Sequence, residues 1–427
     1  MPHTLDQYKV MAQQIFQDLI TASSPNSIYS NSNYWQVGNV YDTLLDYMQY
    51  AVTQGTMTLQ VARNVNNRVI AFYDSMSGCW YDDYCWWVIT LTKSYTYPHL
   101  FDPADIAKCR TIITDAWNIV NKGKTGLPYS GGAARAFDVC DQTVYGSVKP
   151  LYDGGTWQYD IYTSRTPSAS CDSKHNNPIE VDGLTPPMLG PYQLSVINGL
   201  NMVMTQRLTN YKIIPGIDAA RQYNFIKEWT STAQNAADNL LNPFDSGGKY
   251  GLIRERVSKY LDSTVPMTGY KSTYQSWAGD QGTFIGGLYD YFLVNKDPYC
   301  MDLISKILIG VKEKMTMPFT KDGLSYQAIY SWSGGMDPIN GPDGPMSTDP
   351  ADYCSGLGVF MRYLYYCCQD NDILFIITRD SGYLNLIRQT ADACYNDAYP
   401  VVNQEVPMFR QFNRLASLLA ALRILPS

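Results

Sequence analysis

The chain has 427 residues, of which 45% are hydrophobic and 17% are charged, and its formal net charge is −7. This length allows a large hydrophobic core. The chain is acidic and has no run of Lys or Arg, so the sequence predicts no positively charged surface that would bind a nucleic acid. We therefore expect no nucleic-acid partner. Tyrosine is unusually abundant, with 35 copies beside 9 Trp and 13 Phe. Such side chains suit either stacking on sugar rings or an aromatic-rich core, and composition leaves both open.

Metal, disulfide and membrane signals are weak. His3, His99 and His175 lie far apart without a ligand spacing, so we expect no metal and no cofactor. The cysteines include no Cys-x-x-Cys, which favours buried thiols, with a Cys79–Cys85 bridge as the alternative. No signal peptide or membrane-spanning run is present, which predicts no membrane span and either a cytoplasmic protein or a processed secreted form.

Apolar residues recur with the 3.6-residue period of amphipathic helices along most of the chain. In chain order they predict helices over 4–21, 37–51, 57–75, 83–97, 106–120, 191–209, 214–235, 284–293, 300–315, 351–369, 372–395 and 405–423. Three longer segments, 122–190, 236–276 and 318–350, are rich in Gly, Pro, Ser and Asn. Long loops of this kind in a compact domain are usually functional.

The helix count predicts the architecture. No strand alternation recurs with the spacing of βαβ units, so the predicted class is all-α. About twelve helices in one domain suggest six helical hairpins closed into a toroid, an (α/α)6 barrel with its long loops at one mouth. We expect a single domain over residues 1–427 and a monomer.

Two adjacent carboxylates, Asp82 and Asp83, stand at the predicted start of a helix with aromatics on both sides, Tyr81, Tyr84, Trp86 and Trp87 among them. Acidic residues in the first turn of a helix often accept hydrogen bonds from its free N–H groups and interact favourably with the positive end of the helix dipole. Hydrolysis of a glycosidic bond needs two carboxyl groups, and consecutive helical residues can hold them about 5–6 Å apart, as a retaining mechanism requires. Both interpretations remain open at this point, although capping does not explain the aromatic residues.

The Asp pair followed by aromatics resembles the catalytic signature of glycoside hydrolase family 76, α-1,6-mannanases with an (α/α)6 barrel. Other segments follow the family's order. Residues 34–39, which include Trp35, Gln36 and Asn39, resemble its opening helix, and Gly154 to Trp157 resemble its Gly-Gly loop. Residues 197–200, with Asn198, and 277–282, with Asp280 and Gln281, resemble two later helix starts. These segments cover most of the chain.

The sequence also departs from the family pattern. Gly279-Asp280 replaces Tyr-Asn before the Gln-Gly step, which adds a third carboxylate and removes an aromatic. Cys354-Ser355-Gly356 stands where the family often has Phe-Lys-Gly. These departures bear on which substrate the resemblance implies more than on the fold that it implies.

The resemblance implies a retaining hydrolase of α-mannosides, expected to be an endo-α-1,6-mannanase that needs no cofactor. Asp82 would be the nucleophile and Asp83 the general acid/base, a division that the sequence itself does not decide. A non-hydrolytic member of the same fold, binding or transforming another small molecule or glycan, is the alternative. An epimerase is disfavoured because the histidines lie outside the matched segments. The implied substrate-binding residues are Trp35, Gln36, Asn39, Tyr81, Trp86, Trp157, Asn198, Asp280 and Gln281.

Overall fold

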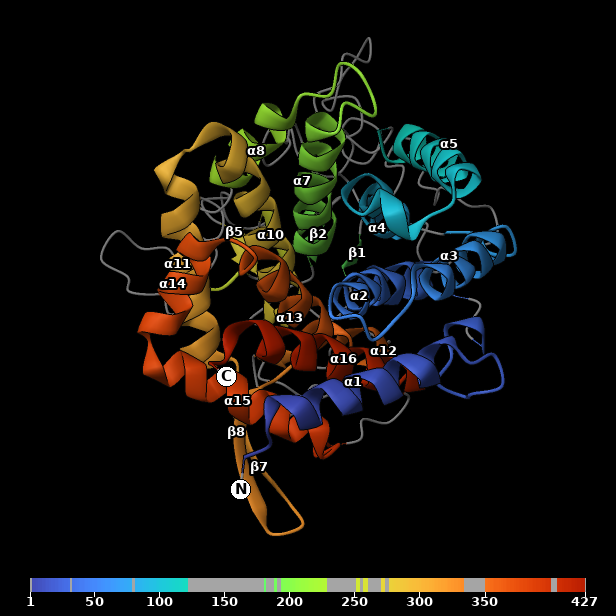
Figure 1. The fold of residues 1–427 in the computed structure, drawn as a ribbon. Helices are drawn as coiled ribbons and strands as arrows, with labels where there is room; N and C mark the ends of the chain where they lie inside the picture. The colour runs from blue at the N-terminus through green and yellow to red at the C-terminus, as the bar shows by residue number, and fades with distance from the viewer. Residues whose placement is uncertain are drawn as a thin grey trace.

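The computed structural model describes residues 2–30, 33–78, 81–121, 180–181, 188–189, 193–228, 251–253, 256–259, 270–272, 276–333, 350–400 and 405–426. Six helices form an inner ring, each packing on the next and the last on the first (Figure 1). In order around the ring they are α2 (Tyr34–Thr53), α4 (Tyr81–Thr96), α7 (Ser195–Asn210), α10 (Ala278–Asn295), α13 (Gly356–Cys367) and α16 (Pro407–Ile424).

An outer layer of helices covers this ring. Its members are α1 (Leu5–Ile20), α3 (Leu59–Tyr73), α5 (Pro103–Val120), α8 (Ala219–Glu228), α11 (Pro298–Lys314), α14 (Asn371–Arg379) and α15 (Ser381–Tyr395). Inner helices pack on outer ones, as α4 does on α5, α7 on α8 and α10 on α11. The predicted six-hairpin toroid of the all-α class is therefore confirmed.

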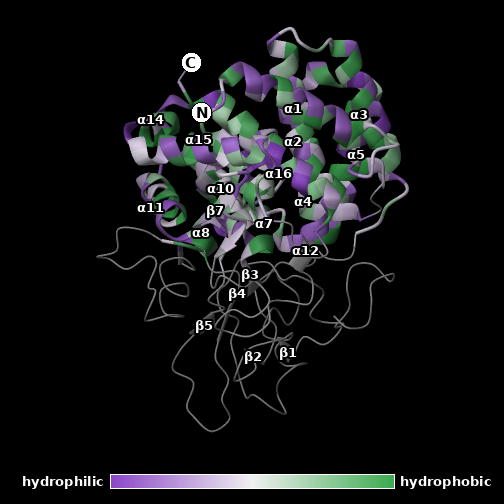
Figure 2. Ribbon diagram, turned by 90° about the horizontal axis from the view of Figure 1, so that it is seen from below, coloured by the Kyte–Doolittle hydropathy of each residue, from purple (hydrophilic) through white to green (hydrophobic). Residues whose placement is uncertain are grey.

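Contacts across the ring show that its helices run parallel. Arg207 near the end of α7 pairs with Asp290 near the end of α10, at 3.1 Å between Nε and Oδ2. Near the helix starts, Arg362 of α13 donates to Asn39 of α2. The first turns of the inner helices consequently gather at one end of the ring. In Figure 2 this end faces the strands β1 to β5, and both chain termini lie on the opposite side.

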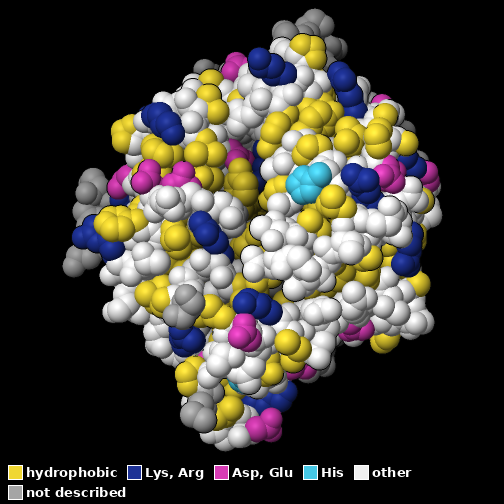
Figure 3. All heavy atoms as spheres, viewed as in Figure 1, with side chains coloured by type: hydrophobic (Ala, Val, Ile, Leu, Met, Phe, Trp, Pro, Cys, Tyr) yellow, Lys and Arg dark blue, Asp and Glu magenta, His cyan; other side chains and the backbone are white. Residues whose placement is uncertain are grey.

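Burial explains why these sequences form the inner helices. Leu44 and Met48 of α2 and Phe284 and Leu288 of α10 are fully buried. Inner helices are enclosed by the ring and by the outer layer, so their apolar faces are broad. Outer helices keep a polar face, and Figure 2 shows the mixed hydropathy of that layer. Figure 3 shows acidic and basic side chains scattered over one face among hydrophobic and other side chains.

The strands are short and antiparallel throughout. β1 (Glu180–Val181) pairs with β2 (Met188–Leu189), and β6 (Ser276–Trp277) with β9 (Trp332–Ser333). β4 (Arg256–Lys259) lies between β3 (Gln193–Leu194) and β5 (Tyr270–Ser272). β7 (Thr316–Lys321) and β8 (Leu324–Ile329) form a projecting hairpin (Figure 1).

The β7–β8 hairpin corrects the prediction of a loop from residue 318 onward. Asp322 and Gly323 connect the two strands with φ of 52° and 76°. An Asp-Gly pair at positive φ is the turn that joins two strands in a tight hairpin. The sequence signal was therefore present in the dipeptide, although the strands themselves are not strongly alternating.

Two of the predicted helices are each divided in the structure. The segment 372–395 forms α14 and α15, because Asp380 has extended backbone, with φ −94° and ψ 99°, and its carboxylate accepts from the Tyr383 N–H as the N-cap of α15. The segment 351–369 forms α12 (Pro350–Tyr353) and α13. An Asp that caps the following helix separates two helices whose apolar stripes are nearly continuous.

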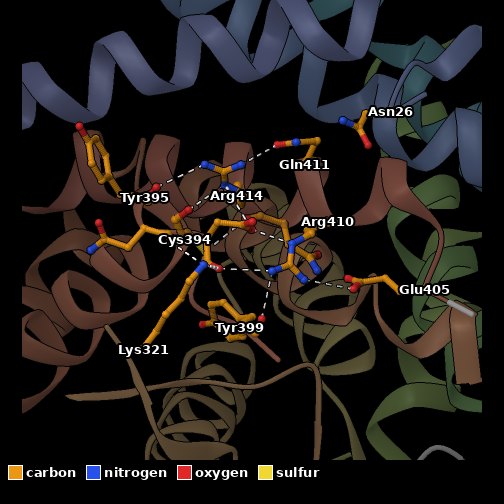
Figure 4. Close-up of polar contacts among 12 residues, drawn as sticks. Asn26, Lys321, Cys394, Tyr395, Tyr399, Glu405, Arg410, Gln411 and Arg414 are labelled. Carbon is orange, nitrogen blue, oxygen red and sulfur yellow. Dashed lines mark hydrogen bonds and ion pairs between the residues drawn. The ribbon is translucent and has the colours of Figure 1, made fainter. Parts of the chain in front are cut away.

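Cations from other elements cover the carbonyl groups at the end of α15 (Figure 4). Arg414 donates from Nε to the Cys394 carbonyl at 2.7 Å, and Lys321 donates to the Asp397 carbonyl at 2.6 Å. Arg410 binds the Asp397 carboxylate, at 2.7 Å from Nε to Oδ1. Because α15 has no basic residue in its last turn, α16 and the hairpin supply the charge that its terminal carbonyls favour.

No helix in the described part of the chain is long and apolar enough to span a membrane.

Candidate active site

The candidate site begins at the first turn of α4, where Asp82 and Asp83 follow Tyr81. Asp82 remains partly accessible, whereas Asp83 is 4% exposed and Tyr81 is buried. Backbone N–H groups of this turn hydrogen-bond to the Asp82 carboxyl group. Acidic residues suit this place because the N-terminal N–H groups are not used within the helix. The capping interpretation thus describes a real local interaction, and it is compatible with a chemical role.

The electrostatics of the pair favour a bound proton. The pKa of Asp82 is raised well above its ordinary value, first by burial and then by the negative charges of Asp83 and Asp352. The backbone hydrogen bonds oppose this rise. Full ionisation would place like charges side by side in a poorly solvated turn, so burial and the Asp83 charge favour the protonated form of Asp82.

Asp352 is a carboxylate of this site that the sequence did not single out. It lies in α12, on the same side of the ring as β1 to β5 in Figure 2. The Gln36 amide donates from Nε2 to its Oδ1 at 3.3 Å, which connects α12 to the first turn of α2. A lone Asp before a helix carries no sequence signal, so only the tertiary contact reveals it. Gln36, by contrast, was predicted and lies at the site.

Trp35 and Trp86 lie together beside the pair, with ring centroids 6.2 Å apart. Trp35 is partly exposed and also contacts Phe409, at 5.4 Å between centroids, whereas Trp86 is 1% exposed. Trp35 is therefore the member with an accessible ring, and Trp86 supports it from below. Trp87 is fully buried and donates from Nε1 to the Tyr34 carbonyl at 2.7 Å, so it belongs to the core.

Beneath the pair, Asn39 is fully buried, and its backbone and side-chain oxygens both accept from Arg362, at 2.5 and 2.7 Å. Further along α2, Asp42 forms an ion pair with Arg362, at 3.1 Å between Oδ2 and Nε. Lys93 of α4 bonds both Asp42 and Asp46. The middle of the ring thus holds charges of both signs in close pairs, directly below the candidate site.

Gln281 and Asp280 lie in the first turn of α10 and are fully buried. The Gln281 amide accepts from the Ile253 N–H and donates to the Ile253 carbonyl, both at 2.8 Å. It therefore fixes the chain at residues 251–253 as a neighbouring strand would. Asn198 is likewise fully buried in α7, where its carbonyl accepts from Gln222 at 3.4 Å.

The Gly279 departure has a steric explanation. A Cβ atom at this position would lie 2.2 Å from the Trp277 ring, so only glycine fits beneath that ring. Trp277 in turn donates from Nε1 to the Tyr353 carbonyl at 3.0 Å, next to Asp352. The indole of Trp277 thus covers Gly279 and holds α12 in place.

The structure therefore brings Asp82, Asp83, Trp35 and Trp86 together and adds Asp352 through Gln36. Asn39 lies below this group, and the three predicted residues of α7 and α10 are buried in first turns of their own helices. Trp157 lies outside the described residues, as do most of the segments 122–190 and 236–276 that were expected to wall the site.

Comparison with known proteins adds information on the fold. No family model and no curated protein matches the sequence. Among solved structures, the Lin0763 protein from Listeria innocua is similar over 98% of this chain and 97% of its own, with 13% identity and a TM-score of 0.55. The GH76A α-1,6-mannanase from Salegentibacter sp. HEL1_6 is similar over 98% and 99%, with 11% identity and a TM-score of 0.53.

A third similar structure is an inactive variant of that mannanase with two consecutive aspartates replaced by alanine, in complex with α-1,6-mannotetrose. It is similar over 97% of this chain and 98% of its own, with 10% identity and a TM-score of 0.55. At these identities the likeness concerns the fold. The chain has the six-hairpin fold found in solved structures of glycoside hydrolase family 76.

Proposed function

We propose that this protein is a retaining glycoside hydrolase that acts on α-mannosides. The observation that carries the proposal is the coupled pair Asp82–Asp83 in the first turn of an inner helix, with a raised pKa at Asp82. A carboxyl group held protonated beside an ionised one supplies the acid and the nucleophile of glycoside hydrolysis. The shared fold with α-1,6-mannanase structures supports this reading.

The proposed mechanism has two steps. The ionised carboxylate attacks the anomeric carbon while the protonated partner gives its proton to the leaving oxygen, which breaks the glycosidic bond and forms a glycosyl ester. The partner, now ionised, takes a proton from water as the water oxygen attacks the anomeric carbon, and the ester bond breaks with the first carboxylate restored. The family resemblance assigns the nucleophile to Asp82 and the acid/base to Asp83, so substrate binding must leave the proton on Asp83.

Substrate contacts follow from the neighbours of the pair. The partly exposed ring of Trp35 offers a face on which a sugar can stack. Gln36, which follows Trp35 in α2, and its partner Asp352 provide hydrogen-bonding groups for sugar hydroxyls. We propose that the enzyme prefers α-1,6 linkages and cleaves within the chain. The linkage is proposed because the similar Salegentibacter protein is described as an α-1,6-mannanase.

The test is reducing-sugar release from α-1,6-mannan by the wild type and by Asp82→Asn and Asp83→Asn. Each substitution should lower turnover by several orders of magnitude without unfolding the protein. Asp105→Asn is the matched control, since Asp105 is also a mostly buried carboxyl with a raised pKa but lies on the outer helix α5. The control should retain full activity.

Two further measurements test the chemistry. NMR of the first product should show retention at the anomeric carbon, and inversion would contradict the covalent route. A slow-turnover fluorinated mannoside followed by peptide mapping should place the trapped sugar on Asp82. A folded wild type that is inert on every mannan would instead favour the non-hydrolytic alternative.

A further inference from the structure

Arg362 of α13 is a buried cation that contacts several helices of the inner ring. It is 2% exposed. Its Nη1 donates to the Asn39 carbonyl at 2.5 Å and to the Asn39 side chain at 2.7 Å, and its Nε lies 3.1 Å from Asp42 Oδ2. These contacts hold the second turn of α2 against α13. Asp42 forms the ion pair with this charge, and Asp46 lies close enough to feel it.

The faces of the guanidinium group meet aromatic rings. Its central carbon lies 5.5 Å from the Trp86 ring, 5.1 Å from Tyr363 and 5.8 Å from Phe412. Through Trp86 it reaches α4, and through Phe412 it reaches α16. A cation over an indole ring in a desolvated position is a favourable and directional contact. One side chain therefore fixes α2, α4 and α16 relative to α13.

Trp86 connects this contact to the candidate site. Residues three and four apart share a helix face, so the Trp86 ring lies one turn below Asp83 and Asp82 on α4. It also supports Trp35, at 6.2 Å between ring centroids. A shift of Trp86 would move both the carboxylates and the exposed aromatic ring. A displacement of about 1 Å at reacting groups can reduce turnover about a hundredfold.

We propose that Arg362 is a positioning residue that sets the geometry of the Asp82–Asp83 pair through Trp86 and Asn39. The proposal rests on the proposed function for its kinetic part. It depends on the planar fork and the stacking faces of arginine, which lysine lacks although lysine keeps the positive charge. A purely charge-balancing role toward Asp42 would be served by either residue.

The experiment compares Arg362→Lys with Arg207→Lys. Arg207 is the matched control because it is also a buried arginine of the ring, with an ion pair to Asp290 at 3.1 Å and its guanidinium 4.7 Å from the Tyr366 ring. It lies near the far end of α7, away from the first turns. Both variants should lose stability, but only Arg362→Lys should lower kcat, by about 10- to 100-fold, with KM changed less than about threefold.

A second readout does not need activity. Near-ultraviolet circular dichroism sums the signals of all 9 Trp, the Trp35–Trp86 pair among them, and Arg362→Lys should change the tryptophan bands, whereas Arg207→Lys should leave them as in the wild type. Equal effects of the two variants on kcat and on the tryptophan bands would overturn the positioning role. An inert wild type would refute the proposed function, and the dichroism comparison would then decide the positioning role alone.

Discussion

Lys93 neutralises two buried aspartates within the ring, and its removal is the sharpest stability test that the structure offers. Its Nζ lies 2.6 Å from Asp46 Oδ1 and donates to the Asp42 carbonyl at 2.8 Å, and it also pairs with the Asp42 carboxylate. Exposure of the Lys93 side chain is 5%, and that of each carboxylate is 2%. Solvent screening at this place is therefore small.

The substitution Lys93→Met affects the carboxylates of Asp42 and Asp46 differently. Asp42 keeps its ion pair with Arg362, whereas the contact left to Asp46 within the described part of the chain is a long one from the Tyr97 hydroxyl, at 3.5 Å. Breaking a buried pair by removing one partner costs about 3–5 kcal/mol. The unfolding entropy is about 2.1 cal/mol/K per residue, or about 0.9 kcal/mol/K for 427 residues, so Tm should fall by about 3–6 °C.

The assay is calorimetric or dichroism melting at pH 7 of the wild type, Lys93→Met, Asp46→Asn and the double variant. Because the cost comes from the stranded Asp46 charge, the double variant should recover most of the loss. Recovery by Asp46→Asn in the Lys93→Met background, but not in the wild-type background, is the expected pattern. A Tm change below about 1 °C in Lys93→Met, or equal effects of Asp46→Asn in both backgrounds, would refute the reasoning.

The same variant has a predictable pH dependence. Burial raises the pKa of Asp46, followed by the Asp42 charge, and the Lys93 charge opposes that rise. Without Lys93 the pKa of Asp46 rises further, so the folded state binds a proton that the unfolded state releases. The stability of the variant therefore falls as pH rises from the pKa of Asp46 in the unfolded state to its raised pKa in the folded state. Its loss of stability relative to the wild type should shrink at lower pH.

Three other outcomes follow from the structure. Gly282→Ala should lower Tm by about 1–2 °C despite the helix propensity of Ala, because the new Cβ would lie 2.8 Å from the backbone of α13, and a melting curve tests it. Asp352→Asn should move the acidic limb of the pH–rate profile to lower pH, because it removes a charge that raises the pKa of Asp82, the proposed nucleophile. Trp87→Phe should cost about 1–3 kcal/mol in urea unfolding by leaving the Tyr34 carbonyl without its indole donor, and an unchanged midpoint would contradict this.

The periodicity of the sequence was enough to predict where the helices lie, but not the breaks that divide the segments 351–369 and 372–395 into two helices each. Buried inner helices such as α2 and α10 carry apolar residues at the spacing of a helix face, and that pattern is local. The pair Asp82–Asp83 was also predictable, because acidic residues between aromatics at a helix start form a continuous segment.

Only the tertiary structure decided which residues surround that pair. Asp352 reaches it through Gln36, and Arg362 supports it through Asn39, over sequence separations of 316 and 323 residues. Closure of the ring brings the first inner helix, α2, next to the last ones. A local sequence pattern carries no information on such a distant contact. Gln281 was predicted to face a substrate, but its amide is shared with the Ile253 backbone, because a buried polar backbone segment must find partners wherever the fold places it.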